Sequence, residues 1–212
     1  MTEACQYLHD SLSRLPRLRR EDLQKVPPNG VYVLFETGET GHGGERIVRI
    51  GTHRGQRNLA PRIREHLYTP NKDRSIFRKH VGRCLLARAE DEFLAQWEID
   101  LTTKESRALH AHKVDKVRLK EVETDVTRYM TENFSFAVLS IGHQAERLHI
   151  EERLLSTIFH CRDCGPSDTW LGKFHPKSAV IRGCGLWNVQ GLTGPVLTLR
   201  EAQQIIKAGT NA

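Results

Sequence analysis

The fold is decided by the stretch from Pro27 to Glu36, which reads PPNGVYVLFE. Its first four residues are a strong turn signal, because proline fixes φ and Asn-Gly supplies a tight bend. The next six are mainly β-branched and aromatic, which predicts a strand over 31–36. After a connection with four glycines, residues 46–50 alternate polar and apolar side chains and predict the second strand of a hairpin. We expect this connection to be longer than a two-residue turn.

The rest of the chain alternates between helical and strand patterns. The β-favouring stretch 134–141 predicts a third strand. Residues 161–185 are rich in Gly, Pro and Ser, and we expect them to be irregular. Helices are expected at 59–67 (with Asn58 as the cap), 75–86, 144–159 and 199–207, and two or three more in an acidic insertion at 90–132.

This order of elements predicts an α+β domain built on a small sheet. We expect an N-terminal basic helical arm at 1–26, a main domain at 27–190 and a C-terminal helix or tail at 191–212.

Composition narrows the class of protein. In 212 residues, a hydrophobic share of 38% is enough for a core, and no apolar run approaches the roughly 20 residues that a membrane helix needs. The first ten residues lack the layout of a secretory signal, so we expect a cytoplasmic protein with no membrane partner. Five cysteines in that compartment are expected to stay reduced.

The charge is unevenly distributed along the chain. Residues 46–88 hold twelve Lys and Arg against two acidic residues, a net charge of +10. The remainder has 20 basic and 24 acidic residues, a net charge of −4. Such a block attracts a polyanion and favours nucleic acid over a merely solvated basic surface.

A second metal-ligand pattern lies near the C-terminal end. The stretch 160–164 reads HCRDC, and His175 and Cys184 follow it. Cys-x-x-Cys is a genuine zinc-ligand spacing, but the downstream pair lacks the usual close spacing. The pattern therefore favours an ordered loop of reduced thiols, with zinc as the alternative.

Five short elements occur in an order that resembles the GIY-YIG nucleases. Their pattern is most similar to that of the small GIY-YIG type II restriction endonucleases, and the family core spans about 30–88 and 134–190. The elements are Gly30-Val31-Tyr32, Arg49-Ile50-Gly51, Arg62-Ile63-Arg64-Glu65-His66, Ile150-Glu151-Glu152-Arg153-Leu154-Leu155 and Trp187-Asn188.

The resemblance implies a GIY-YIG nuclease-like fold, a small, mainly antiparallel three-stranded sheet flanked by helices, with 90–132 as a helical insertion. It also implies a catalytic set of Tyr32, Arg62, His66, Glu151 and Asn188. In this set Glu151 binds one Mg²⁺ or Mn²⁺, because hard cations prefer carboxylate oxygen. Tyr32 helps to position or deprotonate the attacking water, and His66 accepts the proton from Tyr32. Asn188 orients the site or a phosphate.

Two of these assignments have a neighbouring rival. Arg62 is preferred to Arg64 because only Arg62 lies three intervening residues before His66, so that both project from one helix face. Glu151 is preferred to Glu152 because of its apolar neighbours. Taken singly, each of the five also has a structural explanation, such as a half-buried tyrosine or a solvated arginine.

One departure from the family pattern is Arg49, which replaces the second tyrosine of the signature. An arginine stays protonated and cannot act as a phenol base, although it can bind a phosphate. His53, Arg54 and Arg64 are further expected contacts to the site or to DNA.

The sequence therefore predicts a metal-dependent endonuclease that hydrolyses phosphodiester bonds of double-stranded DNA, of restriction or repair type. Cutting both strands would most simply need a homodimer. The alternative is a DNA-binding protein that retains the fold with weak or no catalysis, which Arg49 favours. An RNA-directed protein is the weaker third reading, because the aromatic content is only 7%.

Overall fold

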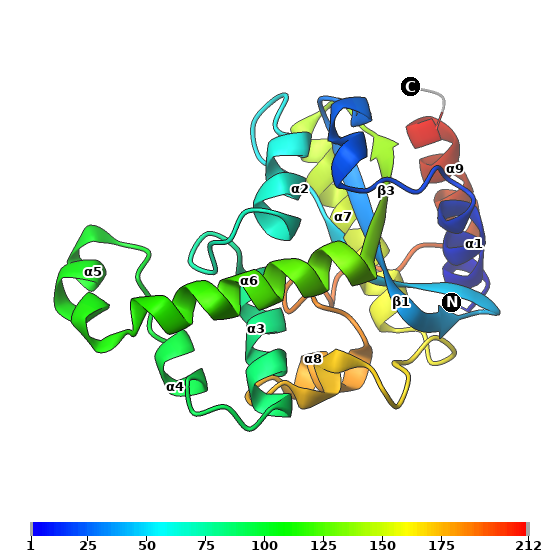
Figure 1. Cartoon of the computed structure of the whole chain (residues 1–212). Coiled ribbons are helices and arrows are strands. Elements are labelled where there is room, and N and C mark those ends of the chain that lie inside the picture. The colour runs from blue at the N-terminus through cyan, green and yellow to red at the C-terminus, as the bar shows by residue number, and fades with distance from the viewer. Residues whose placement is uncertain (1, 211–212) are drawn as a thin grey trace.

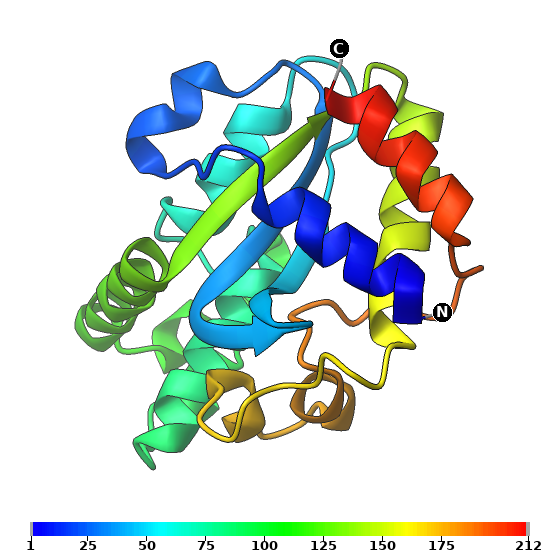
Figure 2. The same cartoon turned by 90° about the vertical axis from the view of Figure 1, so that its right-hand side faces the viewer.

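The computed structural model describes residues 2–210. At its centre lies an antiparallel sheet with strand order β2-β1-β3, formed by β1 (Gly30–Gly41), β2 (Gly44–Gly51) and β3 (Phe134–Ser140). Helices cover both faces of this sheet, as Figures 1 and 2 show from two sides. The α+β class and the three-stranded sheet flanked by helices, expected from the sequence, are confirmed.

The β1–β2 connection is tighter than the sequence indicated. β1 continues past Glu36 to Gly41, which pairs directly with Gly44, so that only His42 and Gly43 form the turn. Both have positive φ, 52° and 79°, as a type I′ hairpin turn requires. The expectation of a longer connection was wrong. The pairing register between β1 and β2 shifts between residues 34 and 40, and this irregularity allows the glycine-containing stretch up to Gly41 to remain part of β1.

Alternation along β1 divides the interior into two cores. Tyr32 and Leu34 face one core, and Val31, Val33 and Phe35 face the other. The first core is closed by α2 (Leu59–Leu67), α3 (Ile76–Arg88) and α6 (Lys116–Asn133). The second is closed by α1 (Thr2–Ser13), α7 (Gln144–Phe159) and α9 (Leu199–Thr210).

The two ends of the chain both contribute to the second core. α1 lies beside α9 on one face of the sheet (Figure 2), and its Cys5, Leu8 and Leu12 are fully buried. A 3₁₀ helix, η1 (Arg20–Lys25), follows α1, and Leu18 forms a bridge to Phe136 in β3. The segments 2–26 and 191–210 therefore share an interior with 27–190.

The insertion between α3 and β3 is helical, as expected. It contains α4 (Leu94–Trp97), α5 (Lys104–His110), the 3₁₀ turn η2 (Ala111–Lys113) and the long α6. Figure 1 shows α5 at the end of α6 that lies farthest from the sheet.

Residues 161–185 are not wholly irregular. They hold a 3₁₀ turn, η3 (Leu171–Phe174), and a short helix, α8 (Ala179–Cys184). Ser178 caps α8 by accepting a hydrogen bond from the Ile181 amide, a signal that the loop-like composition concealed. Within residues 2–210, no helix combines the length and apolar character needed to cross a membrane.

Candidate active site

A cavity of about 540 Å³ opens between β2, α2, α7 and the segment after α8. It collects Arg62, Glu151 and Asn188 from the five expected catalytic residues, together with Arg49. Its other lining residues are Ile76, Leu148, Glu152, Leu155, Trp187 and residues 189–191.

Glu151 presents its carboxyl group to this cavity from the middle of α7. The helix is oriented by Ile150, Leu154 and Leu155, which are buried in the second core. Burial raises the pKa of Glu151, whereas the charges of Arg49 and Arg62 and a hydrogen bond from the Thr52 amide act against that rise.

The cavity suits one hard cation. Mg²⁺ and Mn²⁺ prefer oxygen ligands, and Mg²⁺ is often held by only one or two carboxylates with waters completing its shell. Glu151 supplies one half-buried carboxylate, and the open volume beside it has room for such waters. Glu152 also borders the cavity but is exposed to solvent.

Arg62 approaches the cavity from α2. Its side chain is 34% exposed and forms an ion pair with Glu65 one turn later, at an N–O distance of 2.5 Å. The same carboxylate pairs with Arg74 at 3.0 Å. Arg64 is exposed and is not among the residues that line the cavity. The guanidinium of Arg62 is therefore accessible and balanced by one carboxylate.

Tyr32 and His66 lie behind the cavity rather than on its wall. Both are 1% exposed, and their ring centroids are 6.3 Å apart. The Tyr32 ring covers Gly51, where any Cβ would come within 2.3 Å of the phenolic oxygen. The sequence therefore needs a glycine at the end of β2.

Tyr32 and His66 differ in whether their polar atoms are hydrogen-bonded. The Tyr32 hydroxyl is buried and has no hydrogen-bond partner among the described residues. Such an unpaired buried group is uncommon and needs an explanation. His66 shares a hydrogen bond of 2.7 Å with Ser75 at the start of α3, and not with Tyr32. Burial, together with Arg49, Arg62 and Arg78, lowers the pKa of His66 well below 6.5, so the ring is neutral.

Arg49 occupies the position of the second signature tyrosine, on β2. It is 8% exposed, its guanidinium lies 4.7 Å from the centroid of the Phe77 ring, and it donates to the Trp187 carbonyl at 3.3 Å. Its charge is therefore fixed beside Glu151 and His66.

Asn188 acts as a pairing partner for the edge of the sheet. Its Nδ2 donates to the Ile50 carbonyl at 2.9 Å, and its Oδ1 accepts from the Ile50 amide at 3.2 Å. The Trp187 amide donates to the Val48 carbonyl at 2.8 Å. This segment covers β2, an edge strand whose polar groups would otherwise be unpaired. The amide of Asn188 is thus occupied by backbone.

A buried carboxylate that the sequence reasoning missed holds this segment in place. Glu36, 3% exposed, accepts hydrogen bonds from the indole N–H groups of Trp170 and Trp187, each at 2.9 Å, and from the Tyr129 hydroxyl. Burial raises its pKa, and these three donors oppose the rise. In the sequence Glu36 is only the last residue of an apolar strand, so no local signal marked it.

The loop after β2 carries His53 and Arg54, both expected to contact the site or DNA. His53 is 3% exposed, so the ring is held inside, and this burial lowers its pKa. Arg54 beside it is exposed. The loop is fixed to α7 because Arg147 donates to the Gly55 carbonyl at 2.7 Å.

The basic block at 46–88 is only partly on the surface. Arg46, Arg49, Lys72 and Arg78 are buried, and Arg46 and Arg78 form ion pairs with Glu39 and Glu123. These acidic partners lie outside the block. The positive charge that the block presents at the protein surface is therefore smaller than its net charge of +10 suggests. Its exposed members are Arg54, Arg57, Arg64, Arg74 and Arg88.

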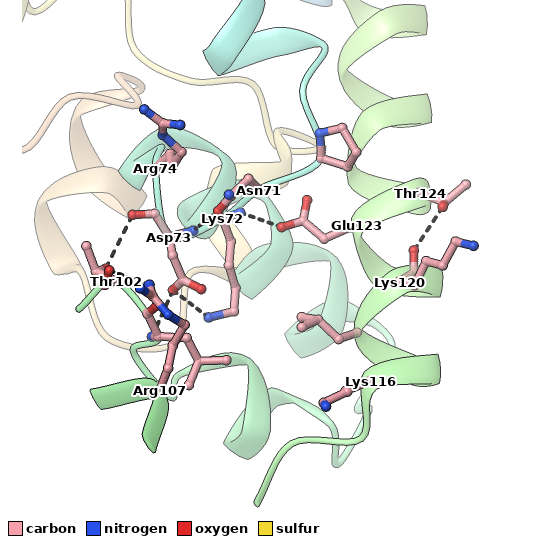
Figure 3. Close-up of a pocket in the computed structure, with 13 residues that line it drawn as sticks. Asn71, Lys72, Asp73, Arg74, Thr102, Arg107, Lys116, Lys120, Glu123 and Thr124 are labelled. Atoms are coloured by element: carbon pink, nitrogen blue, oxygen red, sulfur yellow. Dashed lines mark hydrogen bonds and ion pairs between the residues drawn. The ribbon is translucent and has the colours of Figure 1, made fainter. Parts of the chain in front are cut away.

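A second, larger cavity of about 760 Å³ lies between α6, the loop before α3 and the start of α5 (Figure 3). Lys72 occupies its inner wall, where it pairs with Asp73, and Arg107 fixes the 101–102 backbone. None of the five expected catalytic residues lines it. Arg74 on its wall shares the Glu65 carboxylate with Arg62 of the first cavity.

Comparison with known proteins gives one match. A family model described as the GIY-YIG domain matches residues 3–196. No curated protein and no solved structure matches the chain. The matched range covers most of the chain, including all but the first residue of α1, the helical insertion and every residue that lines the first cavity.

Proposed function

The chain belongs to the GIY-YIG family, which supports nuclease activity, and on this premise we propose that it hydrolyses phosphodiester bonds of double-stranded DNA. The observation that carries the proposal is the meeting of Glu151, Arg62 and Arg49 at one cavity. A carboxylate beside two guanidinium groups combines a ligand for a hard cation with donors for a phosphate.

Arg62 binds the scissile phosphate in this proposal. Guanidinium presents a planar fork of donors that matches phosphate oxygens and stabilises the charge that builds on them. Before DNA binds, Glu65 occupies this fork. The phosphate therefore exchanges with the Glu65 carboxylate.

Glu151 is the ligand for one Mg²⁺ or Mn²⁺ in this proposal. Such a cation neutralises charge on the leaving oxygen when it is bound. Arg49 contributes a second fixed positive charge. By opposing the rise in the Glu151 pKa that burial causes, it favours the ionised carboxylate that the cation needs.

Tyr32 positions the attacking water. Its hydroxyl lacks a partner within residues 2–210 but is buried behind the cavity, so binding this water requires the wall between them to open when substrate binds. His66, kept neutral beside it, is the proposed acceptor of a proton. Asn188 acts indirectly, because its amide holds β2 and the cavity wall in register.

The surface beside the first cavity supports DNA as the substrate. Arg54, Arg57 and Arg64 are exposed on the loop after β2 and on α2, and Arg74 leads to the second cavity. Exposed arginines along a path from the site suit the phosphates of a duplex. Cleavage of both strands by one site per chain is best served by a homodimer in a restriction or repair system.

The test is incubation of the purified chain with supercoiled plasmid and Mg²⁺. We expect conversion to nicked and linear forms, at least 100-fold slower in Glu151→Gln. Glu152→Gln makes the same charge change at the neighbouring exposed position, so we expect less than a tenfold loss. Arg62→Ala and Arg64→Ala form a second matched pair, with the large loss only in Arg62→Ala. Cleavage that survives Glu151→Gln would contradict the metal assignment.

The alternative function is DNA binding without turnover. Arg49 favours it, because a guanidinium replaces the second phenol of the signature. Salt-sensitive binding to duplex DNA with no cleavage under Mg²⁺ or Mn²⁺ would establish this alternative and exclude the endonuclease.

A further inference from the structure

Four metal-ligating side chains meet at a place that the candidate active site does not use. They come from α1 (Cys5), the β1–β2 turn (His42) and the segment after α7 (Cys161 and Cys164). One ligand atom from each lies within 4.8 Å of all the others. Cys5 and Cys164 are buried, and the other two are half-buried.

The distances fit a tetrahedral zinc site. The sulfur atoms of Cys5 and Cys164 are 3.6 Å apart, and Cys161 Sγ is 3.3 Å from His42 Nε2. In a tetrahedral zinc site two thiolates lie roughly 3.8 Å apart, and a thiolate and an imidazole nitrogen roughly 3.6 Å. A disulfide would need about 2.05 Å between sulfurs, and all the cysteines are free thiols.

The backbone is shaped to bring these groups together. His42 has a φ of 52°, a left-handed conformation in which asparagine or glycine is usual. Beside it, a Cβ on Gly41 would lie 2.9 Å from Cys164 Cβ, so only glycine admits that cysteine against the hairpin. Two local features therefore favour the approach of His42 and Cys164.

Neighbouring histidines are engaged elsewhere. His9, one turn after Cys5, lies 3.6 Å from the Cys5 sulfur through Nδ1, but that nitrogen also hydrogen-bonds the Cys5 carbonyl at 3.0 Å, and Nε2 accepts from the Ile47 amide at 3.2 Å. His160 is hydrogen-bonded to the Ser156 carbonyl at 2.9 Å. His175, a downstream ligand in the zinc alternative read from the sequence, instead contacts His80 at 2.8 Å.

We propose that Cys5, His42, Cys161 and Cys164 bind one structural zinc ion. Three thiolates and one imidazole form a closed ligand set with no position left for substrate. Successive ligands are 37, 119 and 3 residues apart in sequence. The ion would therefore fix α1 and the hairpin turn to the segment that follows α7. It would also fix the start of the segment that ends at Trp187 and Asn188.

This site is independent of the proposed nuclease site. Glu151 lies about 12 Å of helical rise before Phe159, the last residue of α7, and Cys161 follows beyond that end. The chemistry also differs, because soft thiolates select zinc whereas a lone carboxylate with waters suits Mg²⁺. Zinc can therefore be measured in a Glu151→Gln variant, where we expect an unchanged content.

The test is the zinc content of the purified full chain. We expect one zinc per chain, which a strong chelator removes with a fall in thermal midpoint. After mild chelation, Cys164→Ser and His42→Ala should each retain at least tenfold less zinc per chain than the wild type. Cys184→Ser is the matched control, because Cys184 lies outside the cluster, and it should retain one zinc per chain.

Cobalt substitution keeps the test decisive if a ligand variant fails to fold. The chelated wild-type chain loaded with Co²⁺ should show tetrahedral d–d bands and thiolate charge-transfer absorption. Alkylation should spare Cys5, Cys161 and Cys164 until chelator is added. A chain purified with added zinc that holds none and gives no such cobalt spectrum would overturn the proposal. A disulfide between Cys5 and Cys164 in the chain as isolated would overturn it equally.

Discussion

At the scale of one residue, Arg49 sets the charge of the candidate active site. It replaces a neutral phenol, is buried and borders the same cavity as Glu151. After burial, which raises the pKa of Glu151, the Arg49 charge is the largest influence that lowers it. This guanidinium therefore opposes the rise in the Glu151 pKa that burial causes.

We predict that Arg49→Gln moves the acidic limb of the pH–activity profile toward higher pH. Loss of the positive charge raises the pKa of Glu151, so the carboxylate that binds the cation is lost at a higher pH. The measurement is kcat/KM for plasmid cleavage between pH 5 and 9. Arg64→Gln removes the same charge from an exposed position and should leave the limb in place. A profile that only loses height, without moving, would indicate that Arg49 acts through packing alone.

Single residues also show what the sequence could and could not predict about position in the fold. Spacing placed Arg62 and Glu151 on helices that do face one cavity, because helix periodicity is a local property. The burial of Arg46 and Arg78 was not predictable, since their carboxylate partners, Glu39 and Glu123, become neighbours only in the fold. The same holds for the His42 and Cys5 partners of the Cys-x-x-Cys pair.

At the scale of elements, prediction was accurate where the hydrophobic period is strong. The helix expected at 144–159 is α7 with the same ends, and Asn58 stands at the start of α2 as expected, although its side chain makes no capping hydrogen bond. Errors arose where a loop-like local composition hides a strand or a short helix. The hairpin glycines were read as a loop, and Ser178 and α8 were hidden in a loop-like segment.

The packing of the insertion on the nuclease core depends on one close approach. Trp97 of α4 is fully buried against α3, and a Cβ on Gly82 would lie 2.2 Å from its ring. The indole N–H also donates to the Lys79 carbonyl at 3.1 Å, which fixes the position of the ring.

We predict that Gly82→Ala lowers the free energy of unfolding by roughly 1–3 kcal/mol, because the ring must move or the helices must separate. The measurement is urea denaturation followed by tryptophan fluorescence. Gly183→Ala in α8 is the control, because its Cβ would meet no atom within 4 Å, and we expect its stability to be equal or higher. Equal stability of Gly82→Ala and wild type would show that α4 is not held against α3 as described.

At the scale of the whole molecule, a pair of neutral histidines joins the helical part to the segment that leads to Asn188. His175, next to η3, accepts hydrogen bonds at Nδ1 from the Lys177 and Ser178 amides, at 3.2 and 2.9 Å. Its Nε2 is therefore the protonated nitrogen, and it donates to His80 of α3 at 2.8 Å. A second proton on His175 would meet two N–H donors.

The surroundings of the pair reinforce its neutral state. The pKa of His80 is lowered to about 3, by burial first and then by the charge of His175, and the pKa of His175 is lowered to about 4, by burial first. Arg83 lowers both values, Arg49 and Arg182 each lower one, and Glu98 opposes the shift in both. Because the folded pKa values lie below the unfolded value of 6.5, the unfolded chain binds more protons between pH 6.5 and about 4.

We therefore predict that the molecule loses stability as pH falls from 7 to 5, by an amount on the order of 2 kcal/mol for a histidine shifted this far. His175→Asn places an amide oxygen near the former Nδ1, so it keeps an acceptor for the two amides but removes the titration. Thermal or urea unfolding at both pH values should show a smaller loss in this variant. His149→Asn, at an exposed position, should keep the full wild-type loss.

Other groups titrate in this range, and buried Glu36 changes stability in the opposite direction because its pKa is raised. The deciding quantity is therefore the difference between the two variants, and an equal loss in both would mean that the His80–His175 contact does not couple folding to pH.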